Sequence, residues 1–156
     1  MQTSPITKKD IASSVIAVPP LARNVDLSLN RDENAALVRH LESGGVTTLL
    51  YGGNANLYHL RLSEYAELLA MLEEIAAERT LVIPSIGPAF GTMMDQVKIL
   101  RDHAYPTVMV LPQVSLTTPG GVETGIRRAV EVLEKPVVLY MKQDGYFELE
   151  GIRRLC

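Results

Sequence analysis

Five short runs of apolar, mostly β-branched residues recur along the chain and predict five β-strands. None of them alternates apolar with polar positions, so we predict strands that are buried on both faces, as in a parallel sheet. Their starts are 32, 34, 27 and 29 residues apart, a spacing that leaves room for one helix in each gap. The five runs are 15–18, 47–50, 81–83, 108–111 and 137–139.

Amphipathic helical patterns fill the gaps between these runs. Apolar residues recur three and four positions apart, which places them on one face of a helix, and the stripe from Tyr65 to Ala76 is a clear example. The predicted helix starts are marked by residues that commonly cap or open helices, or by the onset of the pattern: Asn30, Ser63, Thr92, Thr118 and Glu148.

This alternation predicts an α/β protein in which helical crossovers make all strands parallel, with residues 1–156 in a single domain. Two architectures fit the pattern. One is the first five βα units of a (β/α)8 TIM barrel, a fold of about 250 residues. The other is a complete five-stranded doubly wound sheet. In both, ligands bind at the carboxyl ends of the strands.

Composition and charge exclude several classes of protein. The net charge is −3, and no block of Lys or Arg provides a surface for nucleic acid or for an anionic membrane. No apolar run approaches the roughly 20 residues that span a bilayer. The one cysteine, Cys156, forms no internal disulfide and suits a reducing compartment, so we expect a cytoplasmic protein. Phosphate-loop, dinucleotide and H-E-x-x-H motifs are absent, and we expect neither a cofactor nor a metal.

The segment 51–56, Tyr-Gly-Gly-Asn-Ala-Asn, directly follows the second predicted strand. Two glycines permit a close approach of the backbone to a ligand, and successive N–H groups in such a turn form a concave anion site suited to a carboxylate. A tight βα turn without a ligand explains the same residues equally well. His59 in the same loop has no metal-ligand partner at suitable spacing, which favours a structural role for it.

Tyr140 ends the fifth predicted strand, which places its phenol at the mouth of a sheet or barrel. There it is able to relay protons or to bind a substrate oxygen, and the alternative is a lid over the core. Lys142, two residues later, lies on the same side of the extended chain as Tyr140. It is a Schiff-base candidate only if desolvated, and a solvated loop lysine is the simpler interpretation.

Taken together, these segments resemble the dihydrodipicolinate synthase / N-acetylneuraminate lyase family of class I aldolases, from about Val15 to Leu155. Residues 51–56 align onto the G-T-T-G-E loop of that family. Residues 83–87 resemble its (V/I)-(I/A)-(A/G)-G-(V/T)-G strand, 108–112 the strand before its P-Y-Y motif, and 136–140 its P-(V/I)-x-(L/I)-Y-N-x-P strand.

The resemblance implies a (β/α)8 barrel that assembles as a homotetramer or dimer and acts as a lyase or aldolase. It implies pyruvate or another 2-oxo acid as the partner, bound as a Schiff base on a lysine. Tyr140 matches the proton-relaying tyrosine of the family. Gly53 and Asn54 match the two threonines that hold the substrate carboxylate.

Several positions depart from the family pattern. Asn54 lacks the hydroxyl of the second threonine, Asn56 replaces an acid, Val114 stands where many synthases have a second tyrosine, and Gly145 replaces the arginine of the synthase itself. These changes argue against lysine synthesis and leave a non-catalytic, small-acid-binding paralogue as an alternative.

The family lysine ends the sixth strand, whereas this chain ends 16 residues after Tyr140. The family lysine is therefore not among these residues. We expect more chain to follow Cys156, and we expect this polypeptide not to be a self-sufficient fold, because its first and fifth strands have unpaired edges.

Overall fold

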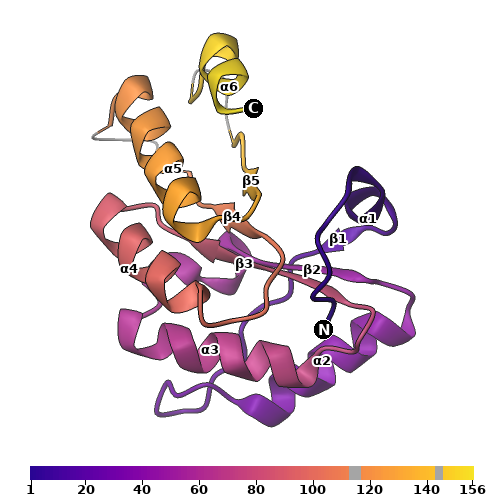
Figure 1. Ribbon diagram of the computed structural model, residues 1–156. Coiled ribbons are helices and arrows are strands. Elements are labelled where there is room, and N and C mark those ends of the chain that lie inside the picture. Colours follow the sequence, from indigo (N-terminus) through magenta and orange to yellow (C-terminus); the bar gives the residue numbers. More distant parts are fainter. Residues whose placement is uncertain (113–116, 143–145) are drawn as a thin grey trace.

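The structure is a computed structural model that describes residues 1–112, 117–142 and 146–156. Five strands alternate with helices along the chain (Figure 1). The strands are β1 (Ile16–Ala17), β2 (Thr48–Tyr51), β3 (Leu81–Ile86), β4 (Val108–Val110) and β5 (Val137–Leu139). The helices are α1 (Lys8–Ala12), α2 (Arg31–Ser43), α3 (Leu62–Ile75), α4 (Phe90–Leu100), α5 (Pro119–Leu133) and α6 (Leu149–Leu155), with 3₁₀ turns η1 (Gly53–Ala55) and η2 (Leu57–His59).

The five strands form one sheet in the order β1-β2-β3-β4-β5, and every neighbouring pair is parallel. Helices α2 to α5 follow one another along one side of the sheet (Figure 1). A doubly wound sheet requires a reordered set of strands with helices on both faces. The doubly wound alternative is therefore wrong, and the sequential parallel arrangement predicted for a barrel is confirmed.

The strand register determines which residues share the face away from the helices. Ser85 pairs with Met109, and Met109 pairs with Val138. Gly52 lies one residue past the pair Tyr51–Pro84, level with Ser85. A Cβ added at Gly52 would lie 2.8 Å from the Met109 methyl carbon and 3.4 Å from the Ser85 hydroxyl oxygen. Gly52, Ser85 and Met109 therefore project from the same side of the sheet.

Three buried tyrosines help to join the helices to the sheet. The Tyr65 hydroxyl of α3 donates to the Ser85 carbonyl of β3 at 2.9 Å, and the Tyr105 hydroxyl donates to the Leu69 carbonyl of α3 at 2.6 Å. Tyr51 at the end of β2 is 1% exposed. Burial raises the pKa of all three phenols. The main core thus lies between the sheet and its helical layer.

The predicted helix starts are right at three positions, including Glu148 directly before α6, and wrong at two others. Asn30 caps α2 by accepting from the Glu33 N–H, and Thr118 caps α5 by accepting from the Gly121 N–H. In contrast, α4 begins at Phe90, ahead of Thr92, after a loop that the Gln96 side chain holds by accepting from the Gly87 N–H at 2.7 Å. Helix α3 also begins one residue ahead of Ser63.

The prediction that every strand is buried on both faces is wrong for the edge strands. Strand β1 is only two residues long, and Ile16 is 44% exposed. All three residues of β5 are half-buried. Each of these strands has one paired neighbour among the described residues, whereas β3 has two and is completely buried. The apolar pattern alone does not distinguish an edge strand from a central one.

Candidate functional site

The loop after β2 presents two free backbone donors at the carboxyl end of the sheet. Its tight turn uses the N–H groups of Ala55, Asn56 and Leu57, which donate to the carbonyls of Gly52 and Gly53 at 3.0–3.3 Å. The N–H groups of Gly53 and Asn54 have no hydrogen-bond partner among the described residues, and both residues are exposed. Two successive free donors are the local arrangement that an anion-binding turn requires.

The local sequence explains this turn. Gly52 accommodates the Met109 side chain at a distance that a Cβ atom would not tolerate without displacing it. Asn56 closes the turn in the left-handed conformation, with φ of 56°, which asparagine adopts more readily than most residues. The prediction of an unusual, ligand-accessible backbone at 52–56 therefore agrees with the geometry, whereas the binding role of Gly53 and Asn54 stays a prediction.

Tyr140 follows β5 at the same edge of the sheet. Val137 and Leu139 line a cavity with residues of α5 and α6, so the alternate positions Val138 and Tyr140 project to the opposite face. Tyr140 is 48% exposed, so it does not fill the core between sheet and helices. Its catalytic role stays a prediction.

Tyr58 borders the Gly53 turn and lies near the phenols of Tyr146 and Tyr140, and its position was not predicted from the sequence. Its ring lies 3.4 Å from the position that a Cβ would take at Gly53, and its hydroxyl donates to the Pro112 carbonyl after β4 at 3.4 Å. Partial burial, followed by the nearby phenols of Tyr146 and Tyr140, raises the pKa of Tyr58. The signal available in the sequence was an aromatic residue two positions after the turn-closing Asn56.

Two buried hydroxyls lie on strands that lead to the site. Thr48 Oγ1 and Ser85 Oγ have no hydrogen-bond partner among the described residues, and both side chains are completely buried. Ser85 is level with Gly52, just below the turn. Unpaired buried hydroxyls are uncommon because each loses its hydrogen bonds to water without replacement.

The other residues singled out in the sequence are Lys142, His59, Val114 and Gly145. Lys142 is exposed. His59 lines a polar cavity of about 450 Å³ together with Arg23, Arg61 and Glu64, and Asn56 at the end of the turn also borders it. Arg23 pairs with Glu64 at 2.9 Å, and this hydrogen bond lowers the pKa of the Glu64 carboxyl. Val114 and Gly145 lie outside the described residues, and those residues contain no cluster of metal-ligating side chains.

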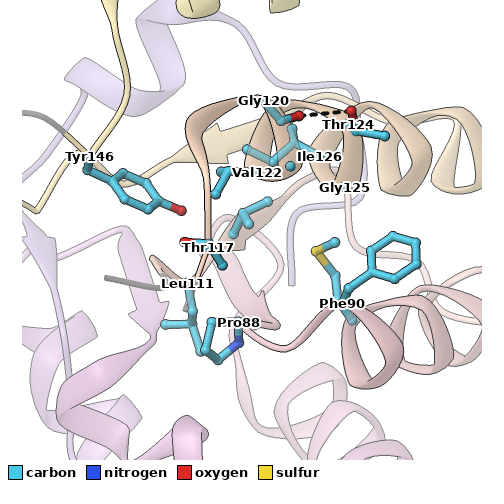
Figure 2. A pocket seen from close by; sticks show the side chains of 13 residues that line it. Pro88, Phe90, Leu111, Thr117, Gly120, Val122, Thr124, Gly125, Ile126 and Tyr146 are labelled. Atoms are coloured by element: carbon cyan, nitrogen blue, oxygen red, sulfur yellow. Dashed lines mark hydrogen bonds between the residues drawn. The ribbon is translucent and has the colours of Figure 1, made fainter. Parts of the chain in front are cut away.

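A second, mostly apolar cavity of about 410 Å³ lies between α4 and α5 (Figure 2). Phe90 and Gly125 form part of its wall, and Tyr146 approaches from the segment after β5 with its hydroxyl directed toward Thr117 and Val122 (Figure 2). Gly53, Asn54 and Tyr140 are not among its lining residues. The cavity is therefore distinct from the strand-end site.

Comparison with known proteins relates the chain to one group of enzymes. No family model matches it. It is 23% identical over 148 residues to a probable 5-dehydro-4-deoxyglucarate dehydratase 2 from Streptomyces avermitilis, covering 94% of this chain and 45% of the relative.

Among solved structures, it superposes on dihydrodipicolinate synthase from Bacillus clausii with a TM-score of 0.79 at 23% identity, covering 91% of this chain and 49% of that one. For 2-keto 3-deoxygluconate aldolase from Picrophilus torridus, the TM-score is 0.78 at 11% identity, and the shares are 91% and 53%.

The parallel, sequential sheet and these structural matches define the fold as α/β, with five consecutive βα units of a TIM barrel. The comparisons also confirm the resemblance to the dihydrodipicolinate synthase / N-acetylneuraminate lyase family. The chain spans about half the length of the proteins that it matches. No helix among the described residues is long and apolar enough to cross a membrane.

Proposed function

We propose that this chain supplies the 2-oxo-acid-binding part of a lyase or aldolase site that acts through a lysine Schiff base. The observation that supports the proposal is the pair of free, exposed N–H groups at Gly53 and Asn54, at the same sheet edge as Tyr140. Ligand sites of β/α barrels form at this edge. A neighbouring structure, a prophage protein of the dihydrodipicolinic acid synthase family from E. coli K12, is in complex with pyruvate.

In the proposed site, each group has a task that its chemistry allows. The N–H groups of Gly53 and Asn54 donate to the carboxylate of pyruvate or of another 2-oxo acid. The Tyr140 phenol, exposed at the end of β5, transfers a proton to and from the reacting carbon or oxygen of the substrate. These contacts orient the 2-oxo group toward the amine that attacks it.

The attacking amine is not one of the five lysines of this chain. A lysine that forms a Schiff base must be uncharged, which requires desolvation or a cationic neighbour. Lys98 pairs with Asp95 at 2.9 Å, Lys135 donates to the His103 carbonyl, and Lys142 is exposed. Lys8 and Lys9 belong to α1, whose residues are all unburied. We propose that the reactive lysine ends a further strand of the barrel.

Borohydride reduction in the presence of pyruvate tests this proposal on the intact natural polypeptide that contains this sequence. Reduction fixes the Schiff base as a stable amine, and peptide mapping then locates the modified lysine. We expect one adduct, on a lysine other than the five named above. An adduct on Lys142 or on any of the other four would contradict the assignment.

The departures from the family pattern favour one other function, a binding protein for small acids without catalysis. Asn54 and Asn56 keep the turn, yet neither provides the hydroxyl or carboxyl of the family loop. If pyruvate binds to the intact polypeptide and borohydride traps no adduct, this second function is correct. We further propose, from the resemblance, a cytoplasmic homotetramer or dimer, which light scattering and cell fractionation would test.

A further inference from the structure

The position of Tyr58 suggests that a third side chain borders the proposed substrate. Its ring packs beside Gly53, one of the two carboxylate donors, at 3.4 Å from the Cβ position. The phenols of Tyr146 and Tyr140 lie close enough to raise the pKa of Tyr58. Tyr58 is 39% exposed, so one side of the ring remains open to a ligand. Tyr58 therefore packs beside one of the two groups to which the proposed function assigns substrate contacts, and it lies near the other.

The hydrogen bond that Tyr58 makes determines what its hydroxyl is able to offer. A phenol has one donor and two acceptor positions. The Tyr58 O–H donates to the Pro112 carbonyl at 3.4 Å, which occupies the donor. A phenol is protonated at neutral pH, and partial burial together with the neighbouring phenols raises the pKa of Tyr58 further above that range. What remains at the exposed side of the oxygen is a neutral hydrogen-bond acceptor.

We infer that Tyr58 is a specificity residue that accepts a hydrogen bond from a hydroxyl of the substrate, so that the site prefers a hydroxylated 2-oxo acid to pyruvate. The inference rests on the proposed function, which assigns the carboxylate to the N–H groups of Gly53 and Asn54. An acceptor beside this cradle cannot bind a second carboxylate, but it pairs with a hydroxyl on the carbon chain. Pyruvate has no hydroxyl to offer, and its methyl group leaves the acceptor unpaired.

Titrations followed by amide chemical shifts test this inference on the intact natural polypeptide that contains this sequence and on its Tyr58→Phe variant. The two probes are pyruvate and 2-keto-3-deoxygluconate, a hydroxylated 2-oxo acid. Phenylalanine keeps the ring against Gly53 and removes only the hydroxyl. We expect the hydroxylated acid to bind the unmodified chain more tightly than pyruvate. In the variant its affinity should fall about fivefold, as expected for one neutral hydrogen bond, while the pyruvate affinity stays the same.

Tyr146→Phe is the matched control, because it removes a phenol from the same neighbourhood. Its phenol also raises the pKa of Tyr58, but its ring lines the cavity between α4 and α5 (Figure 2) and does not lie within 4 Å of the Cβ position at Gly53. We expect this variant to leave both affinities unchanged.

Three results would be decisive. Equal losses for both acids in Tyr58→Phe would make Tyr58 a structural residue and overturn the inference. A preference that survives in the variant would also overturn it, and the proposed function would stand. Failure of the unmodified chain to bind either acid would contradict the proposed function itself.

Discussion

The two unpaired buried hydroxyls lead to a prediction in which removing polar atoms stabilises the protein. Thr48 and Ser85 are completely buried, and neither hydroxyl has a partner among the described residues. Thr48→Val replaces the hydroxyl by a methyl group of similar shape. Ser85→Ala removes the hydroxyl and leaves a small void. Both substitutions should raise the free energy of unfolding, because the folded state no longer contains a desolvated, unbonded hydroxyl.

The expected magnitude follows from the cost of such a group, about 1–3 kcal/mol in proteins. Small shifts of the side chains around the hydroxyl reduce this cost in the folded state. We therefore expect Thr48→Val to raise the free energy of unfolding by about 1 kcal/mol, at the lower end of that range. The gain for Ser85→Ala should be smaller, because the void opposes it. Thr48 pairs with Leu81, four residues before Ser85, which separates the sites by about 13 Å along the strands. At that separation the two effects should add.

Urea titration followed by circular dichroism measures these changes, and thermal melting should show a rise of about 2–4 °C for each kcal/mol. Tyr65→Phe is the control, because its hydroxyl does make a hydrogen bond, to the Ser85 carbonyl at 2.9 Å. This variant should lose about 0.5–1.5 kcal/mol. If Thr48→Val destabilises the protein as Tyr65→Phe does, the Thr48 hydroxyl has a partner and the reasoning is refuted.

Three further predictions concern the core and its charges. Leu72→Ala, at a completely buried position of α3, should cost about 2–5 kcal/mol by urea titration, and a loss below 1 kcal/mol would mean that the core collapses around the gap. Arg23 lowers the pKa of Glu64, so this pair stabilises the protein above the unfolded pKa of about 4.3 and its contribution disappears as the pH falls through the folded value. Glu64→Gln should therefore lower stability by up to about 1 kcal/mol at pH 7 and by nothing near pH 2, and a pH-independent difference would contradict this. Burial raises the pKa of Tyr51, Tyr65 and Tyr105, so stability should be unaffected below the unfolded pKa of about 10 and fall as the pH rises above it. Absorbance at alkaline pH should then show these phenols ionising only as the chain unfolds, and early ionisation of all tyrosines would disprove their burial.

The sheet was predictable because its signals are local and repeated. Five apolar runs at regular spacing, each followed by a helical pattern, require parallel strands, and the order of the strands followed from the family resemblance. The edge character of β1 was not predictable, because exposure of Ile16 depends on how many strands pair beside it. The start of α4 was also missed, because a contact from Gln96 to the backbone of Gly87 fixes the preceding loop.

The candidate site shows the same division between local and non-local information. Glycine and asparagine after a buried strand predicted an exposed turn, and the structure has one at Gly53 and Asn54. Tyr58 does not belong to any recognisable sequence motif. Its position matters only because the fold brings Pro112, 54 residues away, to its hydroxyl. Such a contact depends on the packing of the loops after β2 and β4, which no short pattern specifies.

The most direct test of the proposed carboxylate site is to map where pyruvate binds on the ¹⁵N-labelled intact polypeptide that contains this sequence, with sodium chloride at the same ionic strength as the control. We predict that pyruvate shifts the amide signals of Gly53 and Asn54 and the ring signals of Tyr140. The polar cavity lined by Arg23, His59 and Arg61, together with Asp26 and Glu64, offers a competing site. Pyruvate-specific shifts confined to that cavity, or shifts that sodium chloride reproduces in full, would contradict the proposed site.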